Sequence, residues 1–108
     1  MSGPSLARAA PVFTALGDQT RLALVARLSS EGPLSITRLT DGSAVTRQAV
    51  TKHLGVLAGA GVVRGRWRGR ERIWELAPRR LGEARRALDE ISHKWDEALG
   101  RLRALVEE

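Results

Sequence analysis

The amino-acid sequence predicts a mainly α-helical domain that carries one small β-hairpin. Three observations lead to this fold class. Apolar residues recur at helical spacings of three and four in several short segments between residues 11 and 61. A basic stretch around Arg68-Gly69 then predicts two short strands, and a longer helical repeat runs from Leu81 to Leu105. The 108 residues, 43% of them apolar, are enough for one domain with a modest core.

The composition excludes several classes of protein. The chain has no cysteine, which rules out disulfides, zinc–thiolate sites and thiol catalysis, and it has no tyrosine. With no histidine–carboxylate pair in a recognisable cleft, the sequence does not predict an enzyme. We find no signal peptide and no apolar run near the ~18 residues of a membrane span. We therefore expect a cytoplasmic protein that does not enter the membrane.

The first third of the chain predicts a tail and two helices. Residues 1–10 are small and polar, so we expect a flexible tail there, with the first helix beginning near Pro11. A second helix is predicted from Asp18, a good N-cap residue, to Gly32-Pro33, which would end it. Phe13 and Leu16 form an apolar pair at helical spacing in the first helix, and Leu22, Val25 and Leu28 recur at helical spacing in the second.

Two further helices meet across a short link. A third helix is predicted over "LSITRLTDG", residues 34–42, and a fourth from the N-cap Thr46 to "AGAG", residues 58–61. Two short helices joined in this way form a helix-turn-helix. The fourth helix is expected to bury Val50, Leu54, Leu57 and Ala58 and to turn Gln48 and Lys52 outward.

Residues 62–76 predict a β-hairpin with a basic tip. The first strand begins at Val62, and Arg68-Gly69 supplies the turn, because glycine readily takes a positive φ. The return strand contains Trp74, which we expect in the core. Trp67 lies near the tip, and its role stays open, although aromatic residues beside arginines also occur where nucleic-acid bases stack.

The last segment, residues 79–108, has the most regular pattern in the chain. Its apolar residues alternate between spacings of three and four over more than three heptads, as in a helix that packs along one seam. So small a domain cannot cover a seam of this length, so we expect a second copy to cover it in a two-fold dimer. Packing entirely within one chain is the alternative. The residues predicted at the dimer interface are Phe13, Leu81, Ala84, Leu88, Ile91, Trp95 and Leu102.

Positive charge is concentrated in the middle of the chain. Residues 34–80 carry ten Arg or Lys against three acids, a net charge of +7, whereas residues 81–108 carry five against seven. Residues 42–70 contain no Asp or Glu. Such clustering points to a polyanionic partner. A general genomic preference for Arg would not leave the C-terminal third net acidic.

The predicted order of helices and hairpin is the winged helix-turn-helix plan. Asp18 to Arg21 give the pattern D-x-T-R, residues 53–61 give H-L-x-x-L-x-x-A-G, and a basic R-G-R hairpin runs into Trp74 and Leu76. Over residues 10–78, without a gap, this arrangement resembles the arsenic-repressor-like (ArsR) family of bacterial winged-helix transcriptional regulators.

The resemblance implies a homodimer that binds double-stranded DNA. Residues 11–78 would form the winged helix-turn-helix DNA-binding domain and residues 79–108 the dimerisation helix. In the major groove, Gln can bond adenine, and Arg or Lys can bond guanine, while wing arginines suit phosphates or the minor groove. The implied DNA contacts are Arg47, Gln48, Thr51, Lys52 and His53 on the recognition helix and Arg66, Arg68, Arg70 and Arg72 on the wing. For His53, a structural hydrogen bond is an equal alternative.

The metal-sensing residues of the family do not carry over. Its cysteine site lies on the helix before the recognition helix, where this chain reads "LSITRLTD". Its other site uses two histidines with carboxylates on the last helix, but no second histidine follows His93. We therefore expect no metal site and no cofactor. The polar set Asp89, His93, Asp96 and Glu97 is interpreted as a solvated face, with weak metal binding as the alternative.

The sequence therefore favours a sequence-specific transcriptional regulator, a homodimeric repressor that reads a palindromic operator. Two alternatives stay open: a non-specific architectural nucleic-acid-binding protein, and a winged helix that serves only protein–protein contact. The mixture of Gln48, Thr51 and Lys52 favours sequence reading, because phosphate binding alone needs only Lys and Arg.

Overall fold

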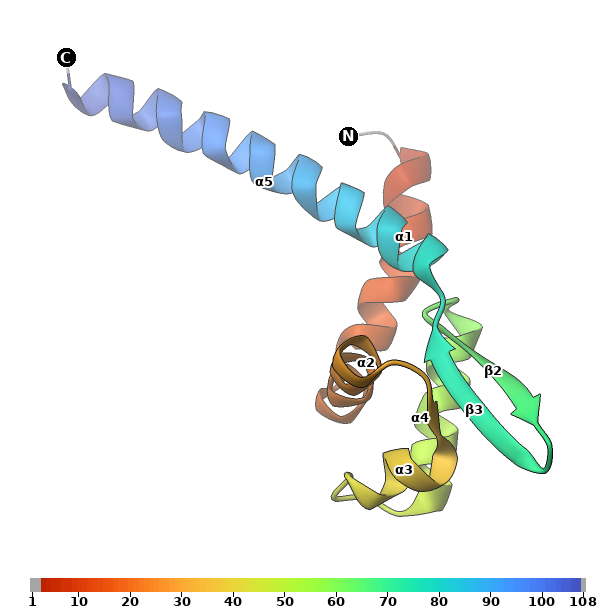
Figure 1. Cartoon of the computed structure of the whole chain (residues 1–108). Helices are drawn as coiled ribbons and strands as arrows, with labels where there is room; N and C mark the ends of the chain where they lie inside the picture. The colour runs from red at the N-terminus through yellow and green to blue at the C-terminus, as the bar shows by residue number, and fades with distance from the viewer. Residues whose placement is uncertain (1–2, 108) are drawn as a thin grey trace.

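The computed structural model describes residues 3–107, with side chains from Leu6 onward. The elements follow in the order α1 (Gly3–Leu16), α2 (Gln19–Glu31), β1 (Leu34–Ser35), α3 (Ile36–Asp41), α4 (Arg47–Gly59), β2 (Val63–Arg68), β3 (Glu71–Leu76) and α5 (Pro78–Glu107) (Figure 1). The predicted fold class is confirmed, since the chain is mainly helical with a small antiparallel sheet in the winged helix-turn-helix order.

The first helix begins earlier than the sequence predicted. α1 already starts at Gly3 and contains Pro11. The flexible tail predicted for residues 1–10 is therefore wrong from residue 3 onward, while residues 1 and 2 lie outside the described range. Inside α1, Pro11 removes the hydrogen bond to the carbonyl of Ala7, and its ring crowds that carbonyl, so the helix continues at a cost that packing of its apolar face has to offset. The apolar face that provides this packing consists of Ala9, Val12 and Ala15, all buried, rather than Phe13.

The second helix has the predicted ends but a different inward face. The carboxylate of Asp18 caps α2, as predicted, and Gly32 ends it. Leu24 and Leu28 are buried, whereas Leu22, which belongs to the predicted apolar pattern, is 53% exposed. Spacing alone allowed a stripe through Leu22. The positions of α1, α4 and the sheet, which α2 packs against, decide which side is covered.

The sheet contains one strand that the sequence did not reveal. The two-residue strand β1 pairs with β3, with Leu34 opposite Trp74, and the strand order is β1-β3-β2. Its pairing partner lies about forty residues further along the chain, and a local pattern cannot show such a pairing. The predicted turn between β2 and β3 is confirmed, with Gly69 at a φ of +64°.

The core lies between the helices and one face of the sheet. Val50, Leu54 and Leu57 of α4 are fully buried in it, as predicted, and so is most of Trp74 from β3. Ala58, expected in the same stripe of α4, is exposed. Burial of these three side chains holds α4 against the body of the domain and leaves its opposite side free.

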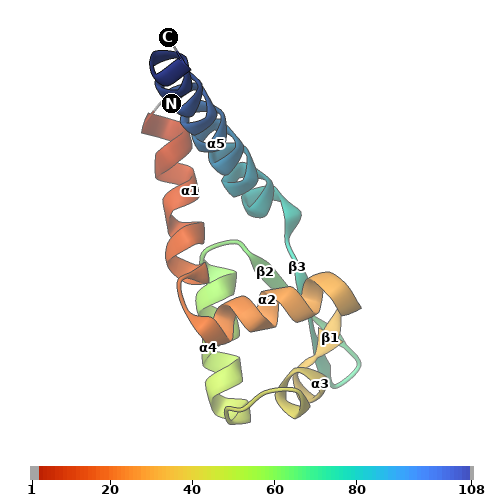
Figure 2. The ribbon, with the colours of Figure 1, turned by 90° about the vertical axis from the view of Figure 1, so that its left-hand side faces the viewer.

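The last helix extends far beyond this core. α1 and the first turns of α5 pack side by side, and the rest of α5 projects outward from the body (Figure 1 and Figure 2). The molecule measures 66 × 28 × 20 Å, with a radius of gyration of 17.9 Å. A compact domain of this length would have a radius of gyration of about 13 Å. The excess comes from a long helix that its own chain does not cover.

Candidate nucleic-acid interface

Two side-chain caps fix the helix-turn-helix. The hydroxyl of Thr46 accepts a hydrogen bond of 3.1 Å from the backbone N–H of Ala49 at the start of α4, which confirms the predicted cap. The hydroxyl of Ser35 does the same for Arg38 at the start of α3, also at 3.1 Å. Each cap satisfies a backbone donor that the helix leaves unpaired. Both helices therefore begin at defined residues.

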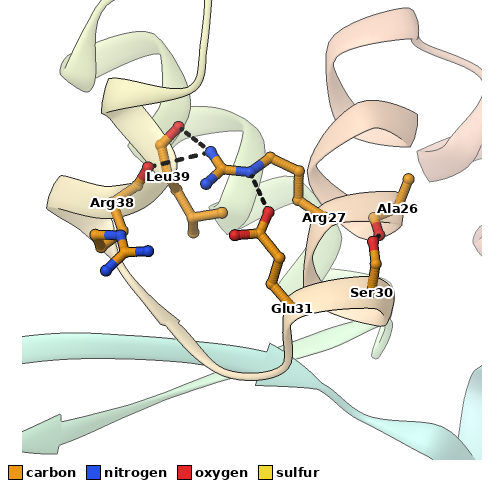
Figure 3. Close-up of polar contacts among 6 residues, drawn as sticks. All are labelled: Ala26, Arg27, Ser30, Glu31, Arg38 and Leu39. Carbon is orange, nitrogen blue, oxygen red and sulfur yellow. Dashed lines mark hydrogen bonds and ion pairs between the residues drawn. The ribbon is translucent and has the colours of Figure 1, made fainter.

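A third constraint on the helix-turn-helix comes from α2. Nη1 of Arg27 donates to the backbone carbonyls of Arg38 and Leu39, at 3.1 and 3.2 Å (Figure 3). Nε of Arg27 donates to the carboxylate of Glu31 at 3.0 Å, and this bond lowers the pKa of Glu31. Gly42 leaves room for the guanidinium, because a Cβ there would overlap it. Arg27 was not among the predicted residues, although its spacing of four from Glu31 is visible in the sequence.

The outward side of α4 carries most of the predicted contacts. Arg47, Gln48, Thr51 and Lys52 are all exposed on the side away from the core. The hydroxyl of Thr51 donates to the carbonyl of Arg47 at 2.9 Å, so its oxygen can still accept a hydrogen bond from a ligand. No acidic side chain interrupts α4. The helix therefore offers amide, hydroxyl and ammonium groups to a partner rich in negative charge.

His53 occupies a different place from these four residues. It is half-buried, and its Nδ1 lies 3.5 Å from Nη1 of Arg21 and 3.9 Å from the carboxylate of Asp18. Nε of Arg21 also donates to the backbone carbonyl of Ala15, at the end of α1, at 2.6 Å. The geometry therefore favours the structural alternative for His53. These contacts also form one polar junction that joins α1, α2 and α4. Asp18 and Arg21 of the D-x-T-R motif take part in it.

The carboxylate of Asp18 is stabilised in its charged form at this junction. The backbone N–H of Arg21 donates to it at 3.0 Å and is the main cause of a lowered pKa of Asp18. The charges of Arg21 and His53 lower the pKa further, while desolvation opposes the shift. Because the folded-state pKa is depressed, the charged cap stabilises the fold above the unfolded pKa of Asp. This contribution is lost as the pH falls through the folded pKa.

We therefore expect Asp18→Asn to change the pH dependence of stability more than stability itself. Asn caps helices about as well as Asp, so near neutral pH the variant should lack only the contribution of the charge. As the pH falls below about 4, the wild type loses this contribution, and the two proteins should converge in stability. Thermal unfolding between about pH 2 and 7 measures this. Asp18→Ala, which removes the cap, should stay less stable at every pH, and parallel curves for wild type and Asp18→Asn would contradict the assignment.

The wing divides its arginines between two faces. On one face, Arg64 and Arg66 each lie beside the carboxylate of Glu75, with N–O distances of 3.4 and 3.2 Å. Arg68 and Arg70 stand at the tip and are exposed. The tip therefore holds the arginines best placed to meet an external anion, while Arg66 is held by a carboxylate.

A basic groove joins the wing to α3. It is lined by Arg66 and Arg68 of β2, by Arg38 of α3 and by Glu71 and Ile73 of β3, among others. Arg38 was not among the predicted contacts, because the sequence gives no sign that α3 and the wing lie next to each other. Its exposed guanidinium extends the basic surface from the wing toward the helix-turn-helix.

Arg72 differs from the other wing arginines. Its Cζ lies 5.2 Å from the ring centroid of Trp67 and 5.2 Å from that of Trp74, so the guanidinium is stacked between two indoles. This cation–π arrangement belongs to the opposite face of the hairpin from Arg66. We therefore group Arg72 with the framework of the wing, apart from the exposed arginines of the tip.

The polar set on α5 lies along its solvent side. Nε2 of His93 lies 3.0 Å from the carboxylate of Glu97, and both side chains are largely exposed. Asp89 and Asp96 are exposed as well. Within residues 3–107, no three His, Asp or Glu side chains gather as a metal site would require. The structure does not bring a second histidine to His93.

The residues predicted for the dimer interface fall into two groups. Ala84 is buried and Leu81 half-buried, because the start of α5 packs on α1. The remaining residues lie uncovered on the same side of α5, or on α1. They are Phe13, Leu88, Ile91, Trp95 and Leu102. Leu88 is 50% exposed and Trp95 is 64% exposed. Leu99, Leu105 and Val106 continue the uncovered side of α5.

No helix in the described part of the chain combines the length and the apolar character needed to cross a membrane.

Known proteins match both the sequence and this geometry. A family described as a helix-turn-helix domain matches residues 16–66. The HTH-type transcriptional regulator Rv2034 of Mycobacterium tuberculosis is 40% identical over 87 residues, which cover 81% of this chain and 78% of that protein. The HTH-type transcriptional repressor SmtB of the same organism is 34% identical over 91 residues, covering 84% of this chain and 65% of SmtB.

A solved structure has the same fold as this chain. An ArsR-like transcriptional regulator from Rhodococcus sp. RHA1 superimposes with a TM-score of 0.77 at 31% identity, covering 94% of this chain and 95% of that one. The capped helix-turn-helix and the basic wing agree with these relatives. The chain belongs to the ArsR-like family of helix-turn-helix transcriptional regulators.

Proposed function

We propose that the protein is a homodimeric repressor that binds a palindromic operator in double-stranded DNA. The observation that carries the proposal is the outward side of α4, where Gln48, Thr51 and Lys52 stand together without an acid. Transcriptional regulators of this family bind double-stranded DNA. Repression is supported by the similarity to SmtB, which is itself named a repressor.

In the proposed complex, α4 of each protomer enters the major groove. Gln48 suits the N6 and N7 atoms of adenine, and Lys52 suits the acceptors of guanine. Arg47 and Thr51, nearer the edge of the helix, suit the adjacent phosphates. The wing tip contacts the flanking backbone or minor groove through Arg68 and Arg70. The two α4 helices would reach half-sites about 34 Å apart, one turn of the duplex.

The exposed surface supports the dimer. The chain exposes 7439 Å², whereas a compact monomer of 11.8 kDa exposes about 5,900 Å². The excess, roughly 1,500 Å², is ample for the ~800 Å² that each partner buries in a standard interface. The uncovered apolar side of α5 offers a surface on which a second copy can pack. An effector would act by changing the separation of the two α4 helices.

Selection of duplexes from a random library tests the proposal. The wild-type protein should enrich a two-fold symmetric sequence, which we call the selected duplex. Competition at fixed salt should then show at least ~10³-fold tighter binding to it than to random duplex. Equal affinity for both would identify a non-specific binder, and absence of binding to any duplex at low salt would favour a protein–protein role.

The wing arginines should contribute to affinity without reading sequence. Replacing both Arg68 and Arg70 with Ala is expected to weaken binding to selected and random duplexes alike. The slope of log K against log salt should become shallower by ~0.9 for each phosphate that the variant no longer neutralises. Arg101→Ala, which removes a charge from the far part of α5, serves as the control and should leave the slope unchanged. An unchanged slope in the double variant would remove the tip from the interface.

A further inference from the structure

The wing carries a large aromatic side chain that the proposed function does not use. Trp67 of β2 is 67% exposed. It lies directly opposite Arg72 in the ladder of β2 and β3. Trp74, two residues beyond Arg72, is buried. The three side chains form a continuous stack that begins in the core and ends at an open indole face.

Gly65 makes this stack possible. It pairs with Trp74 across the ladder, and it leaves a slot that the guanidinium of Arg72 fills. An ideal Cβ at Gly65 would lie 2.6 Å from Nε and 2.9 Å from Cζ of Arg72. Any other residue would push Arg72 out of the stack. The position of Trp67 is therefore built by its neighbours and is not that of a freely rotating surface residue.

Trp67 also faces the side of the sheet on which α4 lies. Side chains alternate between faces along a strand, so Val63, Gly65 and Trp67 share one face. Val63 belongs to the core cluster that contains Leu54 and Leu57 of α4. Trp67 continues this face toward the tip, beyond the point where the core ends. A duplex held by α4 and by the tip would pass this open ring.

We propose that Trp67 is a DNA contact of the wing, with its indole packed against the deoxyribose edge of a double-stranded operator beside the bases read by α4. The inference rests on the proposed DNA-binding function and adds a non-ionic contact to it. On its own face of the hairpin the ring stacks on Arg72, and the exposed Arg68 and Arg70 stand beyond it at the tip, so a partner that reaches the ring is anionic and yet offers an apolar edge. The sugar–phosphate backbone combines these two properties.

Removing the ring is expected to change DNA affinity and its salt dependence differently from removing an arginine. Trp67→Ala should weaken binding about tenfold to both the selected and the random duplex, in the lower part of the range for aromatic contacts with nucleic acid. The salt slope should stay at the wild-type value, because an indole displaces no counterion from a phosphate. Trp67→Phe, which keeps a smaller ring, should retain most of the affinity. Anisotropy titrations of all three proteins over a series of salt concentrations measure both the affinity and the slope.

Gly65→Ala gives an independent test, because it keeps every tryptophan and arginine. The three atoms nearest to the added methyl group all belong to the guanidinium of Arg72, the mobile end of a long side chain, so the hairpin should still form. Loss of the stack should free the ring and weaken binding several-fold, again with an unchanged salt slope. Circular dichroism checks that both variants fold as the wild type does.

Three outcomes would overturn the proposal while leaving the repressor function intact. Wild-type affinity in Trp67→Ala would remove the ring from the interface. A shallower salt slope would mean that Trp67 only arranges the arginines. A loss confined to single-stranded DNA would assign the ring to an unpaired base. If the wild-type protein itself bound no duplex, the proposed function would fail first.

Discussion

Simultaneous replacement of Leu88 and Trp95 with Glu is expected to give a folded monomer that no longer binds the selected duplex tightly. Both side chains are half or more exposed in the single chain, at 50% and 64%. Their replacement therefore removes little packing within the protomer. In a dimer, the same positions would bury two carboxylates per chain in an apolar interface, which is strongly unfavourable.

The effect on DNA binding should be the largest of any variant described. Two linked α4 helices bind two half-sites with an avidity that can exceed one helix by ~10²–10⁴-fold. The monomer should lose most of this factor. Light scattering after size exclusion measures the mass, and anisotropy measures the affinity. The matched control is His93→Ala with Glu97→Ala, on the far side of the same helix turns, which should stay dimeric. A dimeric Leu88, Trp95 double variant would refute the interface.

Replacement of Gln48 or Lys52 with Ala is expected to cost ~1–3 kcal/mol on the selected duplex and much less on random duplex. Both side chains are exposed and, on an outward helix face, are free to meet base edges. The fold should not change, because the buried stripe of α4 is untouched. Selection repeated with each variant should show a relaxed preference at one symmetric pair of positions.

Comparing the affinity for the selected duplex with that for the random duplex separates contacts to bases from contacts to phosphates. An equal loss of affinity on selected and random duplexes would make Gln48 and Lys52 phosphate contacts only. Lys52→Arg is an informative control, because it preserves charge and can still pair with guanine, but in a different geometry. It should retain non-specific affinity while changing the preferred base. Thr46→Ala would instead weaken every duplex by loosening the start of α4.

Features with a local chemical cause could be predicted from the sequence. The caps at Asp18 and Thr46 depend on a side chain bonding its own backbone three residues on, so they are readable from a few letters. The turn at Gly69 is local in the same way. The exposed side of α4 also followed from spacing and from the missing acids. These are the parts of the candidate interface that needed no knowledge of the fold.

Features set by distant neighbours were missed or misplaced. The start of α1 depends on the burial of small residues such as Ala9, which look ordinary in the sequence. β1 exists only because β3 pairs with it. Arg72 counted as one more basic residue, although its partners Trp67 and Trp74 stack on it across and along the strands. Composition revealed the charge of the wing, but only the register of its strands revealed which arginines remain available.

The aromatic–cation stack of the wing has a consequence for local unfolding. Exposed hairpin tips usually open at almost no free-energy cost, and their amides exchange with solvent quickly. Here the stack ties the middle of the hairpin to Trp74, which is part of the core. Amide hydrogens of β2 and β3 beside the stack should therefore exchange at rates closer to those of the core than to those of a free hairpin. In the proposed DNA complex, a wing that is already rigid would lose little conformational entropy, so more of its contact energy would remain as affinity.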